Sequence, residues 1–346
     1  MKKGSIIFLT ICMLVFCAVG FSGCGNDADQ TADQTGGKTE VLKVGTSFTP
    51  IDGKHVIYQI MEFLEEEVEK ETNGKFDLEL HHSGQLGQER DFIEGISMGT
   101  YKFGTACSVF GNLSDAYNVF DMPYLFKDFD HFARVCRSDI AKDLGKTLEK
   151  ENIVVLGTGL SGGKYHVSNS VRPIKTVADM KGLKIRTMES PLILETMNAL
   201  GASAIPMAWS DVYTGCQQGT IDGVCTVNPG FLSIKLHEVQ DYLSQLGITY
   251  SPQLVIANKQ WWDGLSEEDR TAIQTAVDRA MERHYEDMKV QEDQMKQNLI
   301  DTGLIEVLDQ EDIDIEGFRK AVEPLYEKYA DQYGEWIDRI KALEEV

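Results

Sequence analysis

The sequence predicts an α/β protein of two lobes that are crossed by long C-terminal helices. From Val41 to about residue 250, segments with strand patterns alternate with segments of helical spacing, which is the signature of α/β lobes. From Ser266 to about Leu299 the chain is amphipathic and contains neither Pro nor Gly, as expected of one long helix. A second helical region is expected from about Glu316 to Leu343.

The first elements follow from the spacing of apolar residues. Residues 41–46 have the pattern of a short strand, and the candidates for burial in it are Val41, Leu42 and Val44. A helix with Ile57, Met61, Leu64 and Val68 on one face follows and ends at the Asn73-Gly74 pair, a favourable C-cap. Further elements are expected as a strand with alternating Phe76, Leu78 and Leu80, a helix from about Glu89 to Met98, a strand near Phe103 and a buried strand at Ile153–Leu156.

The composition is that of a folding globular protein, with 346 residues that are 42% hydrophobic, 25% charged and 9% aromatic. The chain has 33 basic and 55 acidic side chains, and its formal net charge is −22. Nucleic acid and anionic lipid headgroups need clustered positive charge, so this balance argues against both as principal partners. A small anionic ligand is compatible with it, because distant charges are screened beyond about 8–10 Å.

The N-terminus has the pattern of an export signal. Two lysines precede an uncharged apolar run, Ile6–Phe21, which is short for a membrane-spanning helix. A Ser-Gly pair and Cys24 follow, and this ending resembles a bacterial lipoprotein signal, although Phe21 stands where such signals usually have Leu. We expect a signal peptide over residues 1–23 and a lipid anchor at Cys24. The alternative is an ordinary signal peptide with a coincidental cysteine.

Residues 24–40 have the composition of a flexible tether, since they are polar and contain a duplicated ADQT. Beyond the leader no segment approaches 18 consecutive apolar residues, so no further membrane span is expected. We expect the first lobe to comprise residues 41–162 and about 250–288. The second lobe is expected to comprise residues 163–249 and about 289–346.

Four collinear stretches carry a family resemblance. They read NGKFDLELHHSGQLGQERDFIEGISMGT at 73–100, VFDMPYLF at 119–126, RPIKTVADMKGLKIR at 172–186 and KGLKIRTMESPLILETMNALGASAIPMAWSDVYTGCQQGTIDGV at 181–224. This sequence resembles the substrate-binding subunits of tripartite ATP-independent periplasmic (TRAP) transporters, the DctP-like family. The resemblance implies a two-lobed fold like that of periplasmic binding proteins, with a hinged cleft and long C-terminal bracing helices.

Arg186 is the residue on which the implied chemistry depends. In the family, the matching arginine forms a bidentate salt bridge with the substrate carboxylate. A planar guanidinium presents two parallel N–H donors to two carboxylate oxygens, which a lysine cannot do. Without the resemblance, an arginine in an apolar stretch would more often form a surface or interlobe ion pair.

The resemblance implies further cleft positions, at which this sequence departs from the family pattern. Lys164 stands where many members have a second arginine, the alternative being a solvated lysine near the hinge. Trp209 replaces a usual Phe, with core packing as the alternative, and Thr226 replaces an Asn that would reach further. The implied contacts from the first lobe are Ser47, Ser108 and Phe110. These departures favour a compact or partly apolar carboxylate over a sialic-acid-like ligand.

Cysteines and catalytic motifs exclude several classes of site. Seven cysteines without a C-x-x-C pair argue against structural zinc and thioredoxin-type chemistry. Two disulfides are possible among Cys107, Cys136, Cys216 and Cys225, but a large core does not need them, and free buried thiols are favoured. The chain lacks H-E-x-x-H and a P-loop. We therefore expect no enzyme, no metal and no cofactor.

The resemblance implies a protein that captures an organic acid in the interlobe cleft and delivers it to the integral-membrane permease of a TRAP-type transporter. We expect it to be exported, and either lipid-anchored to the outer face of the bacterial cell membrane or periplasmic. Contact with the membrane is expected only through the anchor. The alternative function is ligand sensing, in which the bound carboxylate is presented to a membrane receptor.

Overall fold

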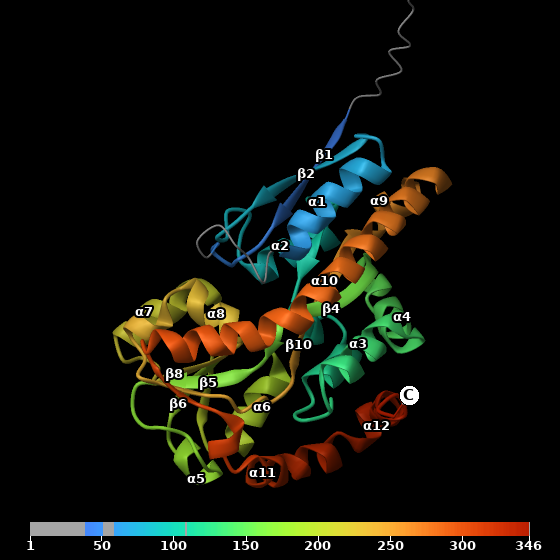
Figure 1. Cartoon of the computed structure of the whole chain (residues 1–346). Helices are drawn as coiled ribbons and strands as arrows, with labels where there is room; N and C mark the ends of the chain where they lie inside the picture. Colours follow the sequence, from blue (N-terminus) through green and yellow to red (C-terminus); the bar gives the residue numbers. More distant parts are fainter. Residues whose placement is uncertain (1–38, 51–58, 108, 346) are drawn as a thin grey trace, which may run out of the picture. The chain divides into compact units, whose positions relative to one another are not determined.

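The computed structural model describes residues 39–50, 59–107 and 109–345. The chain divides into one unit of residues 1–37 and another of residues 38–346, and the described residues belong to the second. The predicted leader, Cys24 and nearly all of the predicted tether lie outside the described residues. Within the second unit, strands of three sheets alternate with helices along the chain, so the predicted α/β class is confirmed (Figure 1).

Two small sheets and the helices around them enclose the first hydrophobic core, which defines the first lobe. β1 and β2 are parallel, whereas β10 lies between β3 and β4 and is antiparallel to both. The strands are β1 Glu40–Gly45, β2 Phe76–His81, β3 Phe103–Ala106, β4 Ile153–Lys164 and β10 Tyr250–Asn258. The helices are α1 Gln59–Glu71, α2 Glu89–Ser97, α3 Phe129–Arg137, α4 Asp139–Lys146 and α9 Lys259–Gly264, with the 3-10 helices η1 Phe110–Asn112, η2 Asp115–Asp121 and η3 Glu149–Glu151.

A six-stranded sheet of order β11-β9-β5-β8-β6-β7 defines the second lobe, and two further hydrophobic clusters form its core. The strands are β5 His166–Asn169, β6 Lys184–Thr187, β7 Ser203–Pro206, β8 Gly223–Thr226, β9 Tyr242–Ser244 and β11 Glu306–Leu308. The helices are α5 Val177–Met180, α6 Pro191–Ala199, α7 Val212–Gln217, α8 Asn228–Ser233 and α11 Ile315–Lys328, with the 3-10 helices η4 Trp209–Asp211, η5 Leu236–Glu238 and η6 Gln310–Asp312.

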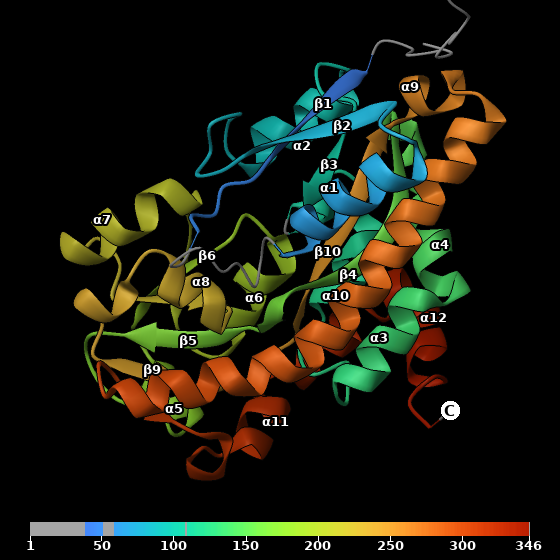
Figure 2. The ribbon, with the colours of Figure 1, turned by 45° about the horizontal axis from the view of Figure 1, so that its top comes forward.

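One long helix, α10 (Glu267–Thr302), runs along both lobes (Figures 1 and 2). Its 36 residues correspond to about 54 Å at 1.5 Å per residue. Ser266 caps its N-terminus by accepting the Asp269 N–H at 3.1 Å, and Gly303 ends it in the left-handed conformation. Met288 is buried in the first core and Leu299 in the second lobe, so the predicted bracing helix is confirmed.

The chain crosses between the lobes where β4 leads into β5 and where β9 leads back into β10. At the first crossing β4 bulges: Lys164 pairs with Tyr250 and Leu160 with Pro252, so three residues of β4 face one of β10. Two of the three, Gly162 and Gly163, have φ of +80° and +104°, a region open to glycine.

Three expectations differ from the structure. Val41 was expected to be buried but is 51% exposed, because it points to the outer face of a strand whose inward residues are Leu42 and Val44. The expected helix over 316–343 is two helices, α11 and α12 (Ala330–Lys341), separated at Tyr329. α12 contributes to the first core rather than the second, and the lobe boundaries stay predictions.

Candidate functional site

Arg186 lies near the carboxyl end of β6. In the six-stranded sheet, β6 is flanked by β7 and β8. The register partners of Arg186 are Val224 on β8 and Ile205 on β7. In open α/β sheets ligands bind outside the carboxyl ends of parallel strands, and β6 is parallel to both neighbours. The side chain is nevertheless almost fully buried, with 4% of Arg186 exposed.

The backbone holds the Arg186 guanidinium in one orientation. Its Nε and Nη2 donate to the Met207 carbonyl at 3.0 and 2.8 Å. A guanidinium has five N–H donors, so the two hydrogens on Nη1 and one on Nη2 are left over. The edge formed by Nη1 and Nη2 can therefore donate two parallel hydrogen bonds to one carboxylate.

Among the described residues no carboxylate is in ion-pair contact with Arg186, and the Glu89 carboxylate acts on its charge from a longer distance. Burial lowers the pKa of Arg186 to about 10, and the group is still a cation at neutral pH. A buried charge without a partner is unfavourable, because the cost of its desolvation is not offset. The site is thus arranged to receive an anion.

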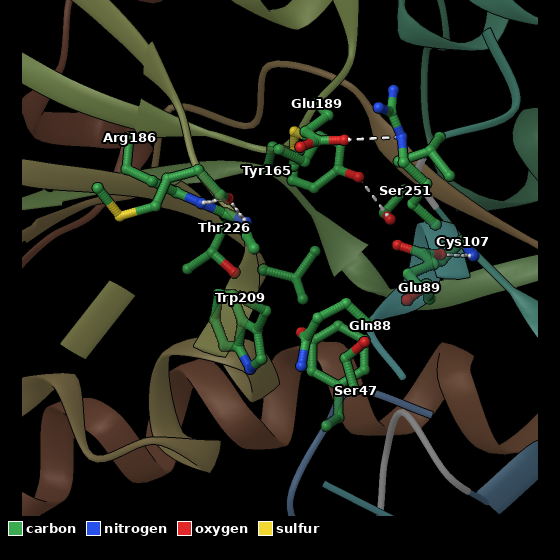
Figure 3. Close-up of a pocket in the computed structure, with 18 residues that line it drawn as sticks. Ser47, Gln88, Glu89, Cys107, Tyr165, Arg186, Glu189, Trp209, Thr226 and Ser251 are labelled. Atoms are coloured by element: carbon green, nitrogen blue, oxygen red, sulfur yellow. Dashed lines mark hydrogen bonds and ion pairs between the residues drawn. The ribbon is translucent and has the colours of Figure 1, made fainter. Parts of the chain in front are cut away.

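Arg186 faces a cavity that is lined from both lobes (Figure 3). Thr226 and Trp209 belong to the second lobe, whereas Ser47 and Glu89 come from the first. The volume of the cavity is about 90 Å³, counted as the space that the centre of a water molecule can occupy. One water needs roughly 10–15 Å³, so the cavity has room for a small organic molecule.

Two aromatic rings form one wall. The centroids of Phe48 and Trp209 are 5.4 Å apart, with an angle of 58° between the ring planes. The Arg186 guanidinium lies 5.2 Å from the Trp209 ring centroid, a cation–π distance. When the carboxylate of an acid binds Arg186, the rest of the acid would therefore pack against this aromatic wall.

The polar side of the cavity is partly engaged within the protein. The Tyr165 hydroxyl donates to Ser251 Oγ at 2.7 Å, and the Glu89 carboxylate accepts the Cys107 N–H. Ser47 Oγ and Trp209 Nε1 are buried and have no hydrogen-bond partner among the residues that the structure describes. Buried polar groups are normally paired, so these two keep hydrogen-bonding capacity that a ligand packed against them can use.

The structure brings together four of the residues predicted to bind ligand: Ser47, Arg186, Trp209 and Thr226 all line this cavity. Whether they bind a ligand stays a prediction. Ser108 lies outside the described residues, as does Cys24.

Lys164 and Phe110 lie elsewhere. Lys164 lines a different pocket, where its Nζ lies 4.9 Å from the Tyr250 ring centroid and its N–H donates to Glu292. Phe110 is 3% exposed and packs in the first core, 5.7 Å from the Tyr117 ring. Neither residue lines the cavity around Arg186, and their predicted roles in ligand binding stay predictions.

Several lining residues were not predicted, among them Gln88, Glu89, Arg90, Tyr165, Glu189 and Ser251. The first three belong to the stretch QLGQERDF, which carried the resemblance but was assigned no role. Tyr165 and Ser251 are adjacent because the β4–β5 crossing and the β9–β10 crossing both pass the cavity.

Cys136, Cys216 and Cys225 are free buried thiols, as the favoured interpretation predicted, and Cys107 is also buried. In the part of the chain that the structure describes, no group of three or more His, Cys, Asp and Glu side chains could hold a metal ion. Nor does any described helix combine the length and apolar character needed to cross a membrane.

Comparison with known proteins identifies the family. The model of the family "bacterial extracellular solute-binding protein, family 7" (DctP) matches residues 51–332. The chain belongs to this family. Its members are solute-binding components of transport systems, and the resemblance to TRAP solute-binding proteins is confirmed.

Relatives of this family 7 protein include the 2,3-diketo-L-gulonate-binding periplasmic protein of Escherichia coli, 33% identical over 309 residues that cover 88% of this chain and 92% of the relative. The fold matches a TRAP periplasmic solute-binding protein from Bordetella bronchispeptica, whose density is assigned to pantoate, with a TM-score of 0.80, 30% identity, and coverage of 88% and 98%. A Polaromonas protein bound to D-erythronate matches with a TM-score of 0.80, 31% identity and the same coverage. The predicted two-lobed fold is thereby confirmed.

Proposed function

We propose that this protein captures an organic acid in the cavity around Arg186 and delivers it to the membrane permease of a TRAP transporter. The observation that carries the proposal is the buried Arg186 cation, which lacks a carboxylate partner among the described residues and keeps two parallel donors free. The relatives support it, since diketogulonate, pantoate and erythronate are all carboxylates.

Capture would proceed by closure of the two lobes on the acid. The cavity walls come from both lobes, which are joined at β4–β5 and at β9–β10. Bringing the walls together buries the acid between Arg186 and the first lobe and excludes water, which strengthens the ion pair. A permease that distinguishes the closed form from the open form would then receive mainly loaded protein.

The test is calorimetric titration of the protein and its Arg186→Lys variant with organic acids. A lysine cannot form the bidentate pair, so binding should weaken by on the order of 2–4 kcal/mol. The matched control is Arg172→Lys, because Arg172 also donates to backbone carbonyls but lies outside the cavity. Equal affinities of the protein and Arg186→Lys would exclude the assigned role.

We further propose that the exported protein is held at the outer face of the cell membrane by a lipid on Cys24. Support comes from the apolar leader that ends in Gly-Cys and from the polar residues that follow. Cys24→Ser should move the protein from the membrane fraction to the soluble fraction without changing its affinity for the acid. An unchanged distribution would favour the ordinary signal peptide.

A further inference from the structure

We propose that the cavity takes a monocarboxylate with a compact, mostly apolar body, and that it discriminates against dicarboxylates and polyhydroxylated acids. The inference rests on the proposed function, because it assumes that the ligand carboxylate binds Arg186. The charges, the walls and the remaining polar groups of the cavity together indicate the class of acid.

The charges allow one carboxylate. The described lining residues include two cations, Arg186 and Arg90, and Arg90 is already paired, with its Nε 3.2 Å from the Glu189 carboxylate. Glu89 is a second carboxylate in the first-lobe wall. A second ligand carboxylate would therefore approach Glu89 and Glu189, and the second cation, Arg90, is shared with Glu189; juxtaposed like charges are costly.

The walls favour an apolar body. Phe48 and Trp209 form the aromatic wall next to Arg186, and further apolar side chains complete the lining. These are Val109, Met188, Met207, Ala208 and Val227. Methionine side chains are flexible and polarisable, so they adapt to branched aliphatic groups as well as to rings.

Most of the exposed cavity surface is apolar, although Gln88, Ser161 and Thr226 add polar side chains to the lining. The Tyr165 hydroxyl donates to Ser251, whereas Ser47 Oγ and Trp209 Nε1 are buried and find no partner in the described part of the chain. Together with the polar side chains of the lining, these groups can serve a few polar substituents beside the carboxylate. An acid with a hydroxyl on every carbon would bury several hydroxyls against apolar walls without hydrogen bonds, which opposes binding.

The experiment is calorimetry on the full-length exported protein after unfolding in guanidinium and refolding, which removes any co-purified acid. The probes are isovalerate and α-ketoisovalerate for the proposed class, succinate as the dicarboxylate and D-gluconate as the polyhydroxylated acid. We expect one of the branched acids to bind on the order of tenfold or more tightly than succinate and gluconate. Tighter binding of succinate or gluconate overturns the inference.

Variants separate this inference from the proposed function. Trp209→Ala should weaken binding of the branched acid by about tenfold, and Trp209→Phe should retain most of it, since the ring wall is kept. Melting temperatures without ligand show whether each variant folds. If succinate or gluconate binds best and Arg186→Met abolishes that binding, the inference fails and the proposed function stands. If no acid binds in an Arg186-dependent way, the proposed function itself fails.

Discussion

Ser190 and Asp121 join the two lobes at a buried contact. The Ser190 hydroxyl, which caps α6, donates to the Asp121 carboxylate at the end of η2. Burial raises the pKa of Asp121 to about 7, and the Ser190 hydrogen bond offsets this only in part. The contact lies four residues beyond Arg186, so an ionisable group sits beside the binding strand at the lobe interface.

Asp121 should make the stability of the protein depend on pH. Its pKa is raised from the ordinary 3.8 to about 7, so between these values the folded state holds a proton that the unfolded state releases. The stabilisation is complete below about pH 4 and is lost as the pH rises through about 7. Asp121→Asn should remove this loss and be more stable than the natural protein at pH 8, by more than about 1 kcal/mol.

Urea unfolding of both proteins at pH 5 and pH 8 measures the difference. The control is Ser190→Ala, which removes the hydroxyl contact but leaves the titrating carboxyl in place. Its pH dependence should therefore persist. Parallel pH curves for the natural protein and Asp121→Asn would contradict the assignment.

Arg186 should lower the stability of the ligand-free protein. A buried cation without a partner is costly, and replacing buried charges by apolar residues is often neutral or stabilising. Arg186→Met should therefore abolish acid binding and raise the free energy of unfolding without ligand by about 1 kcal/mol, despite the lost bonds to Met207. Arg172→Met is the control: Arg172 is half-buried and also donates to carbonyls, so that variant should lose stability. A lower melting temperature for Arg186→Met would show that the buried cation is compensated.

The sequence was most informative where apolar periodicity decides the structure. Met61, Leu64 and Val68 of α1 are all buried, and Ser266 caps α10 as its spacing predicted, because both features depend on neighbours within a few residues. The split at Tyr329 was missed because both helices carry a continuous helical pattern. It arises where α11, on the second core, passes into α12 on the first.

Arg186 was singled out by the family resemblance, since the local sequence alone favoured an ion pair. The position of Lys164 depends on the β4 bulge, in which two left-handed glycines change the direction of the following side chain. The wall around Glu89 could not be derived from local sequence. It forms only when α2 and the second lobe meet, and spacing along the chain does not encode that distance.

The ion pair between Arg90 and Glu189 should favour the closed form. Arg90 belongs to α2 of the first lobe and Glu189 follows β6 of the second, and both line the cavity. Glu189 also accepts a hydrogen bond at its carbonyl from Asn112 of the first lobe, at 2.6 Å. The pair is half-exposed, so Glu189→Gln should weaken acid binding by only about 0.2–1 kcal/mol, mainly through faster release.

Stopped-flow release rates at low and high salt test this ion pair. The loss in Glu189→Gln should shrink at high salt, because exposed charges are screened there. The double variant Arg90→Glu/Glu189→Arg exchanges the two charges. Its loss of affinity should be smaller than the sum of the losses in Arg90→Glu and Glu189→Arg. Additive losses in the double variant would show that the two charges do not interact.

Gly163 and Gly334 should respond oppositely to alanine. Gly163, at the crossing from β4 to β5, has φ +104°, and an added Cβ would lie 3.1 Å from Glu292 Oε1, the atom that accepts the Lys164 N–H. Gly163→Ala should therefore lose about 1–3 kcal/mol, through strain and through this displaced contact. Gly334 lies inside α12 with no atom within 4 Å of an added Cβ, so Gly334→Ala should gain about 0.5–1 kcal/mol. Urea unfolding measures both on one scale, and equal effects of the two substitutions would show that the left-handed turn at the lobe crossing is not required.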